Sequence, residues 1–140
     1  MPTTTLPPKL QAYVDDLGSL DKMTRTLLLL DYADTLAPYP EDAKTDAHLV
    51  PGCVSRVWLD ADFDGTAMHY AAEAEGQIAQ GMVAMLVNGL DGETPDTVLA
   101  VDAGFIRDAG LADSLTPARQ GGLASMLQRM QQAAQPHATG

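Results

Sequence analysis

The spacing of apolar residues near the N-terminus predicts two amphipathic helices. Residues 9–17 place apolar side chains at i, i+3, i+4 and i+7, the spacing of one helix face, and Gly18 is well placed to end this helix. A second helix is expected from an N-cap at Ser19 or Asp21 through Leu36, where two prolines follow. Its run of four leucines is apolar on more than one face, so much of this helix should be buried.

In the middle of the chain the apolar pattern changes to a period of two. Residues 54–61 alternate and are rich in β-branched and aromatic side chains, which predicts a strand. A turn at 62–65 and a returning strand at 66–72 complete a hairpin. A polar loop of residues 37–52 precedes the hairpin, and loops of this length are often functional. The most apolar segment, residues 76–87, predicts a core helix.

The last third of the chain contains one ambiguous segment and one clear helix. Residues 97–113 fit either a series of short helices or one further strand at 98–101, and the pattern does not separate the two. Thr116 is a good N-cap, and Pro117 suits the first helical position because its missing N–H costs nothing there. A helical stripe of leucine and methionine follows to about Ala134.

The order of these elements predicts a single α+β domain. A chain of 140 residues is near the commonest domain size and can bury one core. Helices, then a hairpin, then helices, with no internal repeat or linker, favour one domain over residues 1–140. The Thr- and Pro-rich residues 1–8 and the tail 135–140 are expected to be loose.

Charge argues against two classes of partner. The formal net charge is −11, and the eight Lys and Arg residues form no basic stripe. Such a surface repels phosphate backbones and anionic lipids, so we expect neither a nucleic acid nor a membrane partner.

Several further features indicate a cytoplasmic protein without a metal. No signal peptide is visible at the N-terminus, and no apolar run approaches the roughly 18 residues that span a bilayer. The single cysteine cannot form an internal disulfide, which suits a reducing compartment. The three histidines show no ligand spacing, so no metal centre is expected.

Cys53, the only cysteine, is the leading candidate for chemistry. A free cysteine is most often a small, buried and inert side chain. Here it directly follows Pro51 and Gly52, a pair that bends the chain and leaves room for other atoms to approach the backbone. Reactivity also requires thiolate, and a free thiol has a pKa of about 8.5 unless cations or backbone donors lower it.

Four other residues could support a site at this thiol. His48 lies five residues upstream and either assists the thiol or is a solvated loop histidine. Arg119 occupies the third position of the last helix, where a capping box has Glu or Gln and where the helix dipole disfavours a cation. Either an acidic neighbour compensates, or Arg119 serves a site. Glu75 by itself is explained by the dipole of the helix that follows, and Ser55 by the predicted strand.

Three segments resemble the SufE family of sulfur acceptors in iron–sulfur cluster assembly. VPGCVSRVWL resembles the family signature, which is close to GCQSxVW, and IAQGMVAML resembles a family helix with a fixed glycine. LTPARQGGLASML resembles the family block LTPxRxxGL, and the resemblance covers about residues 8–133. The matching positions are Gly52, Cys53, Ser55, Val57, Trp58, Gly81, Leu115, Thr116, Pro117, Arg119, Gly122 and Leu123.

This resemblance implies a fold, a reaction and partners. The fold would be a small α+β domain with helices packed against a curved antiparallel sheet, as in SufE and NifU-like proteins. Cys53 would accept sulfur as a persulfide from a pyridoxal-phosphate cysteine desulfurase of the SufS or CsdA kind. The protein would need no cofactor of its own, because the pyridoxal phosphate belongs to that partner. The sulfur would pass to a scaffold such as the SufBCD complex, and Arg119 would act near the thiol or at the partner interface.

The chain departs from the family pattern at two positions, and other functions were weighed. Val54 replaces the common glutamine, and His48 stands where the family often has Asn or a small polar residue. The alternative function is a binding regulator of a desulfurase in which Cys53 is incidental. A one-cysteine peroxidase is disfavoured because the chain lacks a thioredoxin-type pattern. The expected protein is a carrier that works with a desulfurase rather than a stand-alone enzyme.

Overall fold

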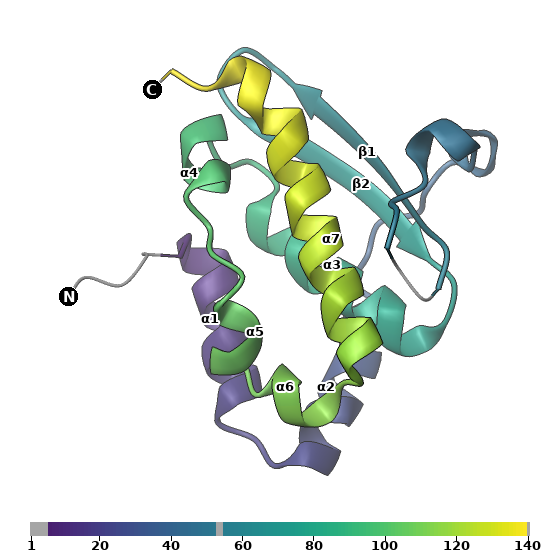
Figure 1. The fold of residues 1–140 in the computed structure, drawn as a ribbon, viewed down its shortest axis with the longest axis vertical. Helices are drawn as coiled ribbons and strands as arrows, with labels where there is room; N and C mark the ends of the chain where they lie inside the picture. Colours follow the sequence, from purple (N-terminus) through teal and green to yellow (C-terminus); the bar gives the residue numbers. More distant parts are fainter. Residues whose placement is uncertain (1–5, 53–54, 140) are drawn as a thin grey trace.

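The structure is a β-hairpin against which helices pack (Figure 1). A computed structural model describes residues 6–52 and 55–139. The sheet has two antiparallel strands, which confirms the α+β class. The elements in chain order are α1 (Pro8–Gly18), α2 (Lys22–Ala33), η1 (Glu41–Ala43), η2 (Asp46–His48), β1 (Val57–Phe63), β2 (Met68–Ala74), α3 (Gln77–Leu90), α4 (Pro95–Leu99), α5 (Phe105–Asp108), α6 (Leu111–Ser114), α7 (Pro117–Ala134) and η3 (Gln135–His137), where η denotes a 3-10 turn.

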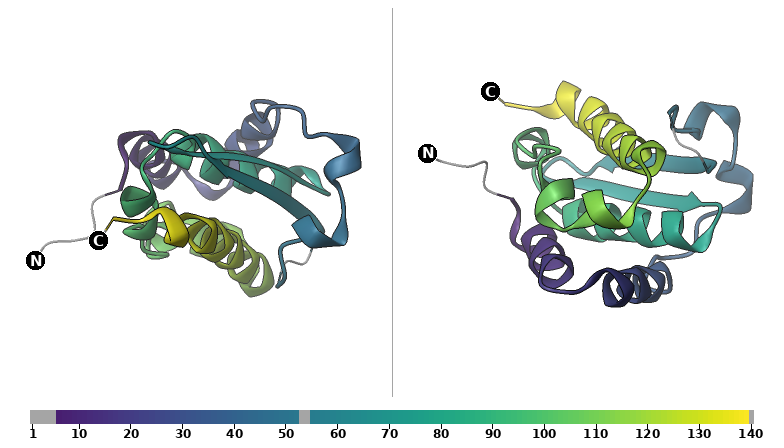
Figure 2. Two further views of the ribbon diagram at one scale, coloured as in Figure 1. Left: turned by 90° about the horizontal axis from the view of Figure 1, so that it is seen from above. Right: turned by 60° about the horizontal axis from the view of Figure 1, so that its bottom comes forward.

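Helix α3 is the central element, as its sequence predicts. It packs against α1 and α2 on one side and against the hairpin and α7 on the other (Figure 2). Ala84, Met85 and Leu86 are fully buried. On the α2 side, Gly81 lies so close to α2 that an added Cβ would overlap the carbonyl oxygen of Leu29. The two helix backbones therefore touch directly at this glycine.

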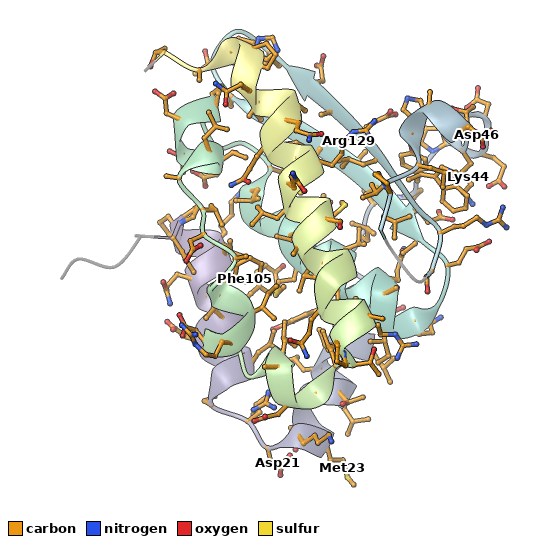
Figure 3. The ribbon with its side chains drawn as sticks, viewed as in Figure 1. Asp21, Met23, Lys44, Asp46, Phe105 and Arg129 are labelled. Carbon is orange, nitrogen blue, oxygen red and sulfur yellow. The ribbon has the colours of Figure 1, made fainter. Side chains whose placement is uncertain are left out.

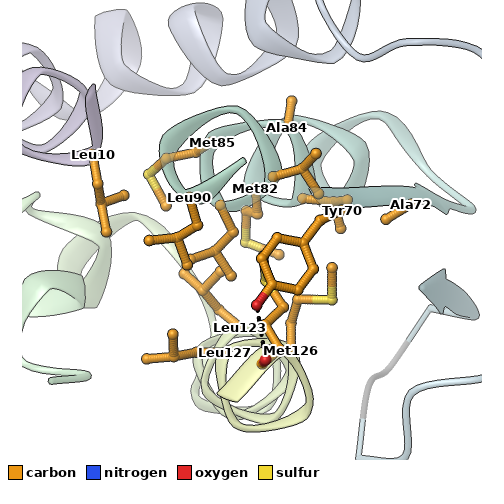
Figure 4. Close-up of a cluster of buried hydrophobic side chains, with 14 of the residues drawn as sticks. Leu10, Tyr70, Ala72, Met82, Ala84, Met85, Leu90, Leu123, Met126 and Leu127 are labelled. Carbon is orange, nitrogen blue, oxygen red and sulfur yellow. Dashed lines mark hydrogen bonds between the residues drawn. The ribbon is translucent and has the colours of Figure 1, made fainter. Parts of the chain in front are cut away.

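Leucine and methionine side chains fill the space between α3 and α7. Figure 4 shows Met82 and Leu90 of α3 facing Leu123 and Met126 of α7. Tyr70 of β2 crosses this layer, and its hydroxyl donates a 2.9 Å hydrogen bond to the Met130 carbonyl oxygen. The hairpin is thereby tied to α7 through the middle of the core.

The hairpin begins later than the sequence predicts. Its register runs from Val57 opposite Ala74 to Phe63 opposite Met68, so Ser55 and Arg56 precede the strand and do not belong to it. The expected alternation also fails at the start of β1, because Val57, Trp58 and Leu59 are all buried. The preceding loop lies against β1 there, because Leu49 forms an isolated antiparallel bridge with Trp58.

Other elements differ from expectation for local reasons. Asp21 is the N-cap of α2, but this helix ends at Ala33 and not at Leu36. Just after its end, the Thr35 hydroxyl donates to the Tyr32 carbonyl oxygen at 2.7 Å. The leucine run is only partly buried, since Leu27 is 56% exposed.

For two further segments, residues 97–113 and the C-terminal tail, the sequence left the structure open or predicted it differently. Residues 97–113 form short helices, so the alternative of a strand at 98–101 is wrong. The tail expected to be loose makes contacts: Thr139 donates hydrogen bonds to the Asp96 carboxylate, and the His137 ring stacks on Phe63 at 4.3 Å.

Arg25 is a buried cation that the sequence pattern did not reveal. Its guanidinium donates to the carbonyl oxygens of Leu17, Leu20 and Gly110 and to the Ser114 hydroxyl, at 2.6–3.0 Å. Since these acceptors take four of its five N–H donors, the burial of Arg25 is compatible with a stable core. The side chain joins the α1–α2 corner to the short helices α5 and α6.

The far end of the hairpin carries a His–Asp pair. One oxygen of Asp64 accepts the N–H groups of Thr66 and Ala67 at 2.8 Å, and the other lies 2.7 Å from His69 Nε2. The backbone hydrogen bond from Ala67 and, next in size, the side-chain hydrogen bond from His69 lower the Asp64 pKa to about 2. The hydrogen bond to Asp64 in turn raises the pKa of His69.

We expect Gly81→Ala to destabilise the protein by about 1–3 kcal/mol, because a methyl group has no room between α2 and α3. Gly121→Ala is the matched control. Gly121 lies within α7, and an added Cβ there meets nothing within 4 Å. This variant should gain about 0.5–1 kcal/mol from helix propensity. Urea unfolding measures both, and equal stabilities would contradict the close contact.

We expect Asp64→Asn to lower the pH at which His69 titrates, because the variant removes the carboxylate charge that stabilises the imidazolium. The raised pKa of His69 and the lowered pKa of Asp64 mean that this pair stabilises the hairpin fully between the ordinary pKa values of the two groups, about 3.9 and about 6.5. The contribution is lost as pH rises through the higher pKa of the folded state. NMR titration of the His69 ring measures the effect, with Asp34→Asn as control. An unchanged His69 titration would exclude the pair.

Candidate functional site

Cys53 and Val54 lie outside the described residues, and the described residues that flank them in the chain, Gly52 and Ser55, come shortly before β1. Gly52 has a φ of +85°, a left-handed conformation that glycine adopts without strain. A Cβ at this position would lie 2.7 Å from the Ser125 hydroxyl oxygen of α7. The turn before the cysteine therefore rests directly on α7, and only a glycine fits there.

The segment before this turn is attached to two elements. The Val50 N–H donates to the Val57 carbonyl oxygen at 2.8 Å. Arg129 of α7 donates from Nη2 to the Ala47 carbonyl oxygen at 3.2 Å. In Figure 3 the Arg129 side chain extends from α7 toward the loop that carries Lys44 and Asp46. Although the sequence predicts an open loop here, residues 47–50 are fixed to both β1 and α7.

His48 makes two short contacts within this segment. Its Nδ1 lies 2.6 Å from the Ala43 carbonyl oxygen, and its Nε2 lies 2.7 Å from Asp60 Oδ1 on β1. The ring nitrogens therefore hold the loop and the strand together. A direct role of His48 at the thiol, one of the two interpretations of its sequence position, stays a prediction.

Two cations lie near the Trp58 ring. Lys44 Nζ is 5.5 Å and Arg56 Cζ is 5.6 Å from the ring centroid, within cation–π range. Lys44 forms an ion pair with Glu73, and Arg56 forms a two-pronged pair with Glu75 at 2.8 and 3.0 Å. The bond from Arg56 lowers the pKa of Glu75. Glu75 thus has a specific cationic partner beyond the helix dipole proposed from sequence.

Arg119 lies beside a small apolar pocket. Ser55 and Arg119 line this pocket with apolar residues of β1, α3 and α7, and its free volume is about 20 Å³, room for one water-sized group. As predicted, Thr116 caps α7, accepting the Arg119 N–H at 3.2 Å. Within the described part of the chain, no carboxylate or other acceptor pairs with the Arg119 guanidinium. The acidic neighbour considered from sequence is therefore not found there.

The cations of an acidic chain gather at this end of the hairpin. Four of the eight Lys and Arg residues surround the segment that contains Cys53: Lys44, Arg56, Arg119 and Arg129. The first two are paired with carboxylates, whereas the last two have no carboxylate partner among residues 6–52 and 55–139. Nearby cations favour a thiolate over a thiol. Support of an anionic sulfur group at Cys53 by these cations stays a prediction.

The described residues provide neither a metal-binding cluster nor a membrane-spanning helix. No group of three or more His, Cys, Asp or Glu side chains among them could hold a metal ion. Among the same residues, no helix is both long and apolar enough to cross a membrane.

Fold and site together define a small α+β domain in which helices pack on an antiparallel hairpin, with a turn at Pro51–Gly52 that the only cysteine follows in the sequence. The chain belongs to the SufE family, whose profile, described as an Fe-S metabolism associated domain, matches residues 11–134. This confirms the family resemblance of the sequence motifs and connects the protein to iron–sulfur metabolism.

Known relatives agree with this assignment. A SufE-like protein of Synechocystis sp. is 36% identical over 132 residues, which cover 94% of this chain and 83% of the relative. SufE-like protein 1 of Arabidopsis thaliana, a chloroplastic and mitochondrial protein, is 36% identical over 95% of this chain but only 36% of its own length. The solution structure of a hypothetical protein from Thermus thermophilus superimposes with a TM-score of 0.82 at 30% identity, covering 94% of this chain and 97% of that one.

The site brings together residues that sequence reasoning named and residues that it missed. Ser55 and Arg119, named from sequence, line one pocket, although more than sixty positions separate them. Asp60 and Arg129 were not identified. In the sequence, Asp60 is typical of an outward-facing strand residue and Arg129 of an ordinary helix cation. Only the packing of the loop against β1 and α7 gives them partners.

Proposed function

We propose that this protein accepts sulfur on Cys53 from a cysteine desulfurase, stimulates that enzyme, and passes the sulfur on for cluster assembly. Membership of the SufE family implies an interaction with a cysteine desulfurase and a role in iron–sulfur metabolism. The single observation that carries the finer proposal is the position of the only cysteine, which occupies the matching place in the family signature.

The proposed reaction is a thiol–disulfide exchange in which sulfur is the transferred group. The Cys53 thiolate attacks the outer sulfur of the persulfide on the desulfurase. A new S–S bond forms at Cys53, the S–S bond of the donor breaks, and the donor cysteine leaves as a thiolate. No external oxidant or reductant is consumed, and the partner's pyridoxal phosphate has already done the carbon–sulfur cleavage. We propose that this chain itself needs no cofactor.

The surroundings of the cysteine support this chemistry. Arg119 has no carboxylate partner among the described residues and lines the same pocket as Ser55, two positions after Cys53. A guanidinium near the sulfur would stabilise the attacking thiolate and the anionic persulfide. The chain also contains no second cysteine that could resolve a persulfide into an internal disulfide. Transfer to a scaffold such as SufBCD is the natural next step.

The alternative is a regulator that binds a desulfurase without carrying sulfur. Its support is the extent of the family match, which includes the core helix and α7 as well as the cysteine turn. In that case Cys53 could be replaced without loss of stimulation.

We expect the intact mass of the protein to increase by one sulfur atom after incubation with a cysteine desulfurase and L-cysteine. Cys53→Ser should abolish this increase, because Cys53 is the only thiol that can hold the sulfur. Desulfurase turnover is measured in parallel. If Cys53→Ser stimulates turnover as strongly as the wild type does, the carrier function is wrong and the regulator remains.

We expect Arg119→Gln to slow sulfur uptake without destabilising the fold. Glutamine at the third helical position can complete a capping box with Thr116, and the change removes a cation from the positive end of α7. Stability in urea should stay equal or rise by up to about 1 kcal/mol. Arg107→Gln, an exposed change on α5, is the control. Unchanged uptake in Arg119→Gln would rule out a role for Arg119 in transfer.

A further inference from the structure

We propose that the outer face of α7 beside the Pro51–Gly52 turn is a docking surface for an acidic segment of the cysteine desulfurase, and that Arg129 binds a carboxylate of that segment. The inference rests on the proposed sulfur-acceptor function and adds to it the chemistry by which the sulfur donor is recognised. Arg129 lies outside the three sequence segments that resemble the family.

Helix α7 contains no acidic residue, although the chain is strongly acidic. Asp and Glu make up 19 of the 140 residues, yet none of the 18 residues of α7 is acidic. Helix α3 also lacks them, but most of α3 is buried, whereas α7 runs along the surface of the molecule (Figure 2). An acidic segment of a partner therefore meets less repulsion along α7 than along α1, where Asp15 and Asp16 are exposed.

A cleft follows the outer face of α7 next to the turn. Its free volume is about 260 Å³, and its lining consists of Pro51, Gly52, Ser125, Gln128, Arg129 and Gln132. None of these six residues is acidic. The volume is below the roughly 300–1,000 Å³ of sites for small molecules. The cleft therefore suits a side chain presented by a partner better than a free ligand.

Arg129 has unused hydrogen-bond donors in this cleft. A guanidinium has five N–H donors, and one of them, on Nη2, donates to the Ala47 carbonyl oxygen at 3.2 Å. None of the ion pairs in the described part of the chain includes Arg129. Asp60 lines a second cleft on which Arg129 also borders, but its Oδ1 lies 2.7 Å from His48 Nε2. A planar guanidinium with open donors is suited to bind a carboxylate through two hydrogen bonds.

Two glutamines on the same face provide polar groups beside Arg129. Gln128 and Gln132 are exposed, lie one helical turn apart, and make no side-chain hydrogen bond among the residues that the structure describes. Gln131, in contrast, donates to the Val101 carbonyl oxygen at 2.8 Å and serves the fold. Side-chain amides both donate and accept. They can therefore bind the backbone of a segment whose carboxylate is held by Arg129.

The cleft lies beside the turn that leads into the cysteine. The turn rests on Ser125, since a Cβ at Gly52 would lie 2.7 Å from the Ser125 hydroxyl oxygen. Arg129 follows Ser125 by four residues, which is about 6 Å along the helix axis. A carboxylate bound to Arg129 would thus hold the sulfur donor close to the turn after which Cys53 comes in the sequence.

The first experiment measures the Kd between the full chain and a cysteine desulfurase of the SufS kind by titration calorimetry. Salt is set to about 0.01 M and about 1 M, where the Debye length is about 30 Å and about 3 Å. We expect Arg129→Glu to raise Kd about three- to tenfold at low salt and less than about twofold at high salt. Arg129→Lys keeps the charge and should recover most of the affinity.

Arg107→Glu is the matched control, because it makes the same change in net charge on the exposed side of α5. Its Kd should stay within about twofold of the wild type at both salt concentrations. Equal losses in Arg129→Glu and Arg107→Glu would show an effect of net charge alone and overturn the docking site. A loss in Arg129→Glu that is independent of salt would show only the missing bond to Ala47, and would overturn it too.

The second experiment leaves Arg129 and its bond to Ala47 in place. Gln132→Glu adds a carboxylate three residues after Arg129, a spacing at which two helical side chains can pair. This carboxylate should compete with the donor and raise Kd about two- to fivefold at low salt. Arg107→Gln makes the same change in net charge and should have no such effect. Wild-type affinity in Arg129→Glu and Gln132→Glu overturns the proposal, and is the result expected if α7 binds only a later sulfur acceptor or a free anion.

Sulfur uptake, measured by intact mass in the same samples, separates this proposal from the proposed function. A wild-type chain that binds the desulfurase but takes up no sulfur contradicts the carrier function, and the effect of Arg129→Glu on Kd still decides the docking site. Normal uptake with an unchanged Kd in Arg129→Glu overturns the docking site alone. A wild-type chain that does not bind the desulfurase contradicts both.

Discussion

The contact between the backbones of α2 and α3 at Gly81 is the constraint on which the other packing depends. Because no side chain separates the two helices there, α3 lies deep enough to be covered by α1 and α2 on one side. Its opposite side is then free to support β2 and α7, and the leucine and methionine layer between α3 and α7 closes the core. The Tyr70 hydroxyl fixes the hairpin to α7 across this layer.

This core places the start of the hairpin and the Pro51–Gly52 turn beside α7, an element distant in sequence. The turn rests on α7 at Ser125, and the preceding segment is bonded to β1 and to Arg129. Arg119 and Arg129, the two cations of this cluster that have no carboxylate partner among residues 6–52 and 55–139, both belong to α7. One helix thus supplies the support for the turn and the local positive charge, in a chain whose net charge is −11.

The sequence was sufficient where one local signal decides the outcome. The cap Thr116 and the continuous apolar pattern of α3 predicted these two helices, and the start of α2 fell on Asp21, one of the two caps that the sequence allowed. It was insufficient where distant packing overrides the local pattern. Trp58 breaks the period of two because the loop at Leu49 covers it, and residues 97–113 carried no pattern that separates short helices from a strand.

The candidate site shows the same contrast between local sequence signals and distant packing. Cys53 and Arg119 could be named as candidates because a turn and a disfavoured helix position mark them in the sequence. Asp60 was missed because its partner, His48, reaches it only through the folded loop. Glu75 seemed explained by the helix that follows it, since nothing local reveals that Arg56 would extend across to it.

The place of the only tryptophan gives the protein an optical signal at the edge of its site. The Trp58 indole is buried at the first strand, with the charges of Lys44 and Arg56 within 6 Å of its ring. Indole emission responds to nearby charge and to solvent access. A partner that drew either cation to its own carboxylates would change that emission, so docking at the base of the hairpin can be followed by fluorescence in the unlabelled protein.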